Sequence, residues 1–158
     1  MNEIQRDNLE RFIEFFKQVK PENFNINYPV KCENPTKIEN LYEDLKNPSC
    51  GTTACVGGML PVFDKERFYF VQDYSPKFFE VVDSLTKEKG YARAFSNYFG
   101  IDYEISKQIC YPSYKIYGTV EEDEITPQMV CEKLQALLDG ESIYFEDEYE
   151  IGEDEYDE

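Results

Sequence analysis

Apolar side chains recur at helical spacing along most of the chain. This spacing predicts helices over residues 3–19, 36–46, from near Thr52 to before Pro61, from Ser75 toward Gly90, and over 91–99, 102–110 and 126–140. Proline and glycine mark several of the predicted ends, because proline breaks a helix and glycine favours its C-terminal stop. The pattern therefore predicts a mostly α fold, a single small domain of about seven short helices.

Extended structure is the minor element of this pattern. Residues 24–28 alternate apolar and polar side chains, and residues 68–71 join aromatic and β-branched side chains, as strands do. Pro29 would limit the first segment. We expect at most a minor extended element beside the helices.

Length and composition agree with one folded domain. The chain has 158 residues, of which 41% are hydrophobic and 16% aromatic, and such a chain can bury a core. The N-terminal residues lack an apolar signal core, and no run of about eighteen apolar residues is present. Its five cysteines are an odd number, which favours free thiols in a reducing compartment. We therefore expect a cytoplasmic protein.

The charge is concentrated at the C-terminus. The formal net charge is −17, and residues 141–158 hold ten acids and no base, which leaves residues 1–140 at −7. Runs of like charge resist compaction. The sequence therefore predicts a helical globular domain over 1–140 and an acidic, aromatic-containing tail over 141–158.

This charge narrows the class of partner. Phosphate contacts and anionic membranes both need a basic surface, so direct binding to nucleic acid or to a membrane is disfavoured. A basic protein is favoured, and a nucleic-acid-binding protein is the natural candidate. We expect the tail to act as a nucleic-acid mimic, in which carboxylates stand in for phosphates and aromatic rings for stacked bases.

The tail is open to three interpretations: a solubilising tail, a docking segment for a basic protein, and a weak divalent-cation site without an EF-hand pattern. Aromatic residues interleave its acids, which distinguishes it from a plain solvating tail. The candidate partner-binding residues are Tyr144, Phe145, Glu146, Asp147, Glu148, Tyr149, Glu150, Glu153, Asp154, Glu155, Tyr156, Asp157 and Glu158.

Catalytic chemistry has few candidates. The chain contains no histidine, which removes the Ser-His-Asp and Cys-His arrangements. If a helix begins near Thr52, Cys50 lies before its N-terminus, where a thiol becomes reactive. Two small buried thiols at Cys50 and Cys55 are the structural alternative. A four-cysteine zinc site and a carboxylate enzyme are weaker alternatives, and we assign no catalytic residue, metal or cofactor.

The segment Cys50-Gly51-Thr52-Thr53-Ala54-Cys55-Val56-Gly57-Gly58 resembles a Cys-Gly-Thr-x-Ala-Cys segment of small uncharacterised bacterial and phage proteins. In those proteins Phe-Phe-Gly, aromatic-Pro-x-x-Tyr and Thr-Pro elements follow. Here Tyr98-Phe99-Gly100, Tyr111-Pro112-Ser113-Tyr114 and Thr126-Pro127 follow in that order. The resemblance covers roughly residues 50–138 and implies no known activity.

The leading hypothesis is a non-enzymatic acidic binding protein, phage-encoded, that inhibits or modulates a basic nucleic-acid-binding host protein. One alternative is an enzyme with a reactive Cys50. The other is a virion or structural accessory protein.

Overall fold

The protein has a mixed α/β fold. A computed structural model describes residues 1–145, and the tail residues from Glu146 onward lie outside the described residues. The α-helices are α1 (Glu3–Phe16), α2 (Ile38–Asp44), α3 (Leu60–Phe63), α4 (Tyr91–Phe99), α5 (Tyr103–Cys110), α6 (Tyr114–Tyr117) and α7 (Pro127–Asp139). Three 3-10 turns are η1 (Pro21–Asn23), η2 (Gly57–Met59) and η3 (Glu122–Glu124).

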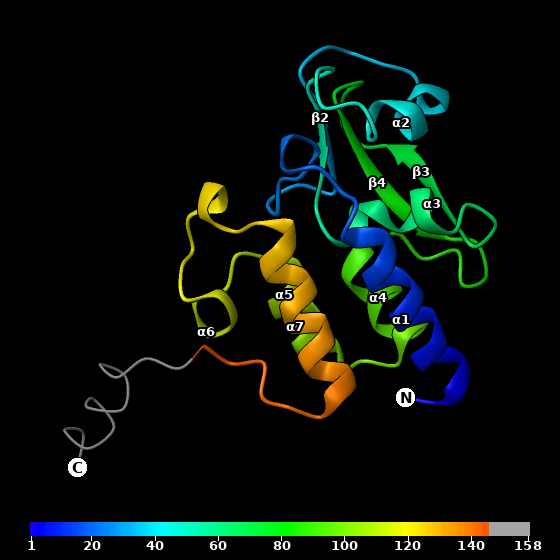
Figure 1. The fold of residues 1–158 in the computed structure, drawn as a ribbon. Coiled ribbons are helices and arrows are strands. Elements are labelled where there is room, and N and C mark those ends of the chain that lie inside the picture. Colours follow the sequence, from blue (N-terminus) through cyan, green and yellow to red (C-terminus); the bar gives the residue numbers. More distant parts are fainter. Residues whose placement is uncertain (146–158) are drawn as a thin grey trace.

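Four strands form one antiparallel sheet in the order β2-β1-β4-β3. Their bounds are β1 (Val30–Cys32), β2 (Thr52–Ala54), β3 (Phe68–Gln72) and β4 (Phe78–Asp83). Figure 1 shows the sheet at one end of the molecule and helices α1, α4, α5 and α7 at the other. The prediction of a mostly α fold is therefore wrong, because the sheet is a full structural layer.

Two predicted helices are strands or turns instead. The helix predicted from Ser75 toward Gly90 is replaced by β4, which pairs with β3 on one side and β1 on the other. Its sequence, Phe-Phe-Glu-Val-Val-Asp, is compatible with both the helical and the strand periodicity of apolar residues. Its aromatic and β-branched side chains fit a strand with neighbours on both sides. The helix predicted from near Thr52 is replaced by β2, η2 and the single turn α3.

The other predicted helices are present with shorter or equal bounds. The caps that the sequence predicts at α5 and α7 are formed: the Asp102 side chain accepts hydrogen bonds from the amides of Glu104 and Ile105, and the Thr126 hydroxyl accepts one from Met129. The strand-like run at 68–71 is β3. Within residues 24–28 only Phe24 forms a β-bridge, to Ala54, and the neighbouring strand β1 was not predicted.

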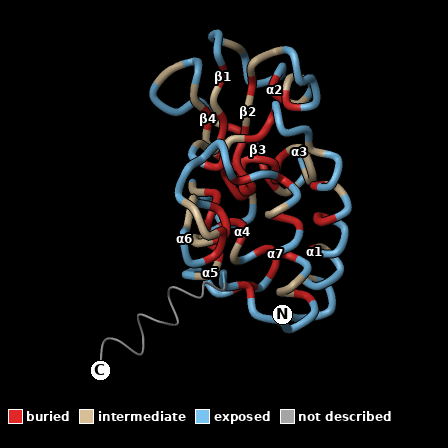
Figure 2. The backbone as a smooth tube through the Cα atoms, turned by 60° about the vertical axis from the view of Figure 1, so that its left-hand side comes forward, coloured by how far each residue is buried: buried red, intermediate tan, exposed pale blue. Residues whose placement is uncertain are grey.

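A single apolar core joins the two ends of the molecule. Figure 2 shows the buried residues running from the sheet into the facing sides of the helices. Phe12 of α1 lies at its centre, with ring centroids 5.2 Å from Phe63, 5.9 Å from Phe95 and 5.2 Å from Phe99. These edge-on and tilted contacts are favourable for aromatic rings, so they fix α1 against α3 and α4.

A buried asparagine ties three elements together at the edge of the sheet. The Asn23 side-chain nitrogen lies 3.3 Å from the Asp44 carbonyl, 2.9 Å from Asn47 and 2.9 Å from Thr52. It therefore donates to the end of α2, to the following turn and to the outer edge of β2. The Asn25 amide closes the same edge by donating to the Ala54 carbonyl at 3.0 Å.

Candidate functional site

The candidate site lies where the chain leaves α7 and reaches residue 145. Gly140 adopts a left-handed conformation that ends α7, and the chain then reverses direction. Ile143 is buried in the core. The Phe145 amide donates a 2.7 Å hydrogen bond to the Lys115 carbonyl of α6. The chain therefore reaches its acidic segment from a fixed position.

Phe145 packs closely on α6. Its ring centroid lies 5.9 Å from that of Tyr114, in a T-shaped contact. Gly118 ends α6 with a φ of +75°, and a Cβ there would come within 2.7 Å of the Phe145 ring. A glycine at this position serves both the turn and the close approach of the ring. Figure 1 shows α6 and the end of the described chain side by side.

Three exposed aromatic side chains lie at this position, and we call them the exit surface. Their exposed fractions are 47% for Tyr114, 48% for Tyr144 and 37% for Phe145. Exposed aromatics with fixed backbones are typical of binding surfaces, because a ring buries much area at a low entropy cost. The exit surface can therefore contact a partner beside the acidic segment.

Only two of the predicted partner-binding residues lie within the described residues. Tyr144 and Phe145 belong to the exit surface, whereas all the predicted residues from Glu146 to Glu158 lie outside the described residues. Sequence reasoning did not assign Tyr114 to the site. This residue stands in the Tyr111-Pro112-Ser113-Tyr114 segment, which was a usable signal, but only the fold brings it beside Phe145.

Acidic side chains also lie close in sequence to α6. The turn η3 holds Glu122, Asp123 and Glu124, and all three are exposed. The Asn27 side chain donates a hydrogen bond to Glu122, and the Thr119 hydroxyl donates one to Glu124 at 2.7 Å. These bonds hold the side chains of Glu122 and Glu124, and all three carboxylates of the turn face solvent.

The prediction of a reactive thiol at Cys50 required a helix that begins near Thr52, and this helix is absent. Cys50 lies in the turn between α2 and β2, and its sulfur is 2.8 Å from the Asp44 carbonyl and 3.1 Å from the Asn47 carbonyl. The one proton of the thiol is shared between two of the three carbonyl oxygens that Asn23 contacts. Its observed role is to cap the carbonyl end of α2.

Cys55 is a core residue. It is fully buried, and burial raises the pKa of its thiol to about 12. Its sulfur accepts a 3.3 Å hydrogen bond from the Gly58 amide. Within residues 1–145, no group of three or more cysteine, aspartate or glutamate side chains has the arrangement of a metal site.

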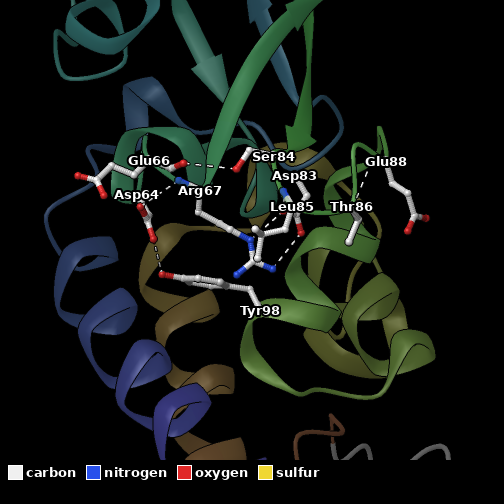
Figure 3. A network of polar contacts seen from close by, with 9 residues as sticks. All are labelled: Asp64, Glu66, Arg67, Asp83, Ser84, Leu85, Thr86, Glu88 and Tyr98. Atoms are coloured by element: carbon white, nitrogen blue, oxygen red, sulfur yellow. Dashed lines mark hydrogen bonds and ion pairs between the residues drawn. The ribbon is translucent and has the colours of Figure 1, made fainter.

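A polar network joins the β3–β4 hairpin to α4 (Figure 3). The Arg67 guanidinium donates to both carboxylate oxygens of Asp83, at 2.8 and 3.1 Å, and lies over the Tyr98 ring. The Tyr98 hydroxyl donates to Asp64 at 2.8 Å. Burial would raise the pKa of Asp83, but the hydrogen bonds from Arg67 and the Leu85 amide hold that pKa below its usual range. Because these charged groups are paired with one another, we assign the network to stability.

Within residues 1–145, no helix is both long and apolar enough to cross a bilayer. Comparison with protein families, with curated proteins and with solved structures finds no match to this chain. The resemblance of residues 50–138 to small bacterial and phage proteins therefore stays a prediction.

Proposed function

We propose that this chain is a non-enzymatic binding protein whose C-terminal segment, residues 146–158, engages the basic surface of a nucleic-acid-binding protein. The observation that supports it best is the exit surface. Its aromatic residue Phe145 is held on α6, and the acidic segment follows directly after it in the chain. The segment itself holds nine acids and no base in thirteen residues. Its carboxylates would replace phosphates, and its aromatic rings would replace bases.

The anchoring at Phe145 supports binding on energetic grounds. Ordering a free chain upon binding costs about 0.5–1.5 kcal/mol for each immobilised side chain. Because Ile143 and Phe145 are already held by the body, that cost is confined to the residues beyond them. The exposed tyrosines of the exit surface would add contact area next to the charged contacts.

The proposal includes a location, an origin and an effect on the partner. The protein would act in the cytoplasm, would be phage-encoded, and would inhibit or modulate its basic partner by occupying the partner's nucleic-acid site. The acidic composition supports the last of these, since a surface that binds phosphates also attracts clustered carboxylates. The reactive-thiol alternative is not favoured, because Cys50 caps α2.

The test compares the full chain with a chain that ends at Phe145, which keeps Ile143 in the core. A core-histone heterodimer serves as the basic nucleic-acid-binding probe, and lysozyme serves as a basic control that is not organised to bind nucleic acid. Binding is measured by fluorescence anisotropy at about 50 and about 200 mM salt. We expect the shortened chain to bind histones at least about tenfold more weakly, which corresponds to about 1.4 kcal/mol.

A matched pair of substitutions tests the exit surface. Tyr144→Ser should weaken histone binding, whereas Tyr74→Ser, which changes an exposed tyrosine in the loop between β3 and β4, should leave it unchanged. Double-stranded DNA should displace the full chain from histones. Equal binding by the full and shortened chains, or equal binding to histones and lysozyme, would refute the proposal.

A further inference from the structure

A groove rimmed by lysines lies beside the C-terminal end of α1. It has a volume of about 830 Å³ and is bounded by the C-terminal end of α1, the turn η1, the end of α2 and the segment that contains η2 and α3. Lys17, Lys20 and Lys46 line it, and none of its lining residues is acidic. We call it the lysine groove.

The lysine groove combines charge with an apolar floor. Five apolar side chains line it: Phe15, Val19, Leu45, Met59 and Val62. Lys17 pairs with Glu14, with 2.7 Å between the nitrogen and the carboxylate oxygen. Within residues 1–145, Lys20 and Lys46 form no ion pair. A protein with twice as many acids as bases thus keeps two unneutralised lysines beside an apolar surface.

Such a groove fits a ligand that carries both carboxylates and apolar groups. Residues 146–158 have this composition, because Tyr149, Ile151 and Tyr156 alternate with the nine acids. The charges are complementary: the described residues 1–145 have a net charge of −8, so most of the molecular surface repels the segment, whereas the lysine groove attracts it.

When extended, residues 146–158 are longer than any helix in residues 1–145. A second cavity of about 690 Å³ shares Lys17, Val19 and Pro21 with the lysine groove and extends to Thr126 and Pro127 at the start of α7. The thirteen residues of α7 span about 20 Å. The thirteen residues after Phe145 span up to about 43–47 Å when extended, which is more than twice that length.

We propose that the lysine groove binds residues 146–158 of the same chain. Tethering favours this occupant over a second copy, because a short flexible linker gives an effective concentration in the millimolar range. The inference rests on the groove and on charge, and it stands whether or not the segment also binds a basic partner. If it does, the groove and the partner compete for the same acidic residues.

The test is zero-length cross-linking of carboxylates to amines in the full chain, followed by mass spectrometry. The expected result is that cross-links from residues 146–158 concentrate on Lys17, Lys20 and Lys46 within the monomer, at a yield independent of protein concentration. The exposed Lys37 and Lys87 are the comparison sites. The yield should fall at about 0.5 M salt, where screening shortens the range of the attraction.

A matched pair of isosteric substitutions provides the control. Gln18→Glu adds one negative charge to the lysine groove, and Gln72→Glu adds the same charge at the exposed end of β3. The first should lower the cross-link yield about two- to fivefold, as expected for one exposed charge near the lysines, and the second should not. Cross-links spread evenly over all lysines, or found only in dimers, would overturn the proposal.

Discussion

Replacing Asn23 with aspartate exchanges the side-chain amide nitrogen, a donor, for a carboxylate oxygen. The substitution tests the hydrogen bonds by which Asn23 connects η1 with α2 and β2. In the wild type the side-chain nitrogen faces the carbonyls of Asp44, Asn47 and Thr52, within 2.9–3.3 Å. The Asn23→Asp substitution keeps the shape but turns an acceptor oxygen toward three acceptor oxygens. The existing amide oxygen is already buried without a partner among the described residues.

The magnitude follows from these contacts. The Asp44 carbonyl still accepts from the Asn47 amide and the Asn47 carbonyl still accepts from the Cys50 amide, so Thr52 is the carbonyl that loses its donor. An unsatisfied buried carbonyl costs about 1–3 kcal/mol, and an uncompensated buried charge raises the total to about 3–5 kcal/mol. We expect Asn23→Asp to lower the free energy of unfolding by about 3–5 kcal/mol at about pH 7.

The pH dependence has a defined sign. Burial among carbonyls would raise the folded-state pKa of the introduced carboxyl above its unfolded value of about 3.9. The deficit relative to wild type is therefore largest at neutral pH. It should shrink as the pH falls toward about 4, by at most about 1.4 kcal/mol per pH unit, because the protonated carboxyl regains a donor.

Urea denaturation of both proteins at several pH values measures this difference. The control is Asn40→Asp, the same chemical change at an exposed position on α2, which should alter the free energy of unfolding by less than about 0.5 kcal/mol. A deficit for Asn23→Asp below about 1 kcal/mol, or one that does not change between about pH 7 and about pH 4, would refute the reasoning.

Three further substitutions test the described contacts. Gly58→Ala would place a Cβ onto the Pro29 carbonyl oxygen, so thermal denaturation should show a loss of at least about 3 kcal/mol or no folded protein. Asp83→Asn should cost about 2–3 kcal/mol at about pH 7, near the low end for a buried pair because Arg67 is partly exposed. Because the folded-state pKa of Asp83 is lowered, the wild type's advantage should persist above about pH 4 and disappear as the pH falls further, as acid titration of both proteins would show. Cys50→Ser keeps a donor and should be tolerated within about 1 kcal/mol in urea denaturation, whereas Cys50→Ala should lose more; equal losses would contradict the capping role.

Sequence reasoning succeeded where the determinant is local. Asp102 and Thr126 cap α5 and α7 because a short side-chain oxygen reaches amides two or three residues ahead. Gly100 and Gly140 end α4 and α7 in the left-handed conformation that glycine adopts without strain. These features depend on neighbours in the chain, so the chain alone predicts them.

Sequence reasoning failed where the partner is distant. The run Phe78–Asp83 forms β4 because β1 and β3 pair with it on both sides, and Thr52–Ala54 forms β2 because β1 lies beside it. Both runs also fit a helical pattern. The predicted reactivity of Cys50 depended on that helix, so its premise was lost when the segment proved to be a strand.

The sequence by itself determined where the charge lies and which aromatic residues accompany it, since composition and order need no folding. Only the tertiary structure brought Tyr114 beside Phe145, and only it gathered Lys17, Lys20 and Lys46 around one groove. Each of these groups joins residues that are far apart in sequence, so their proximity is a product of core packing. The candidate site and the lysine groove are therefore properties of the fold.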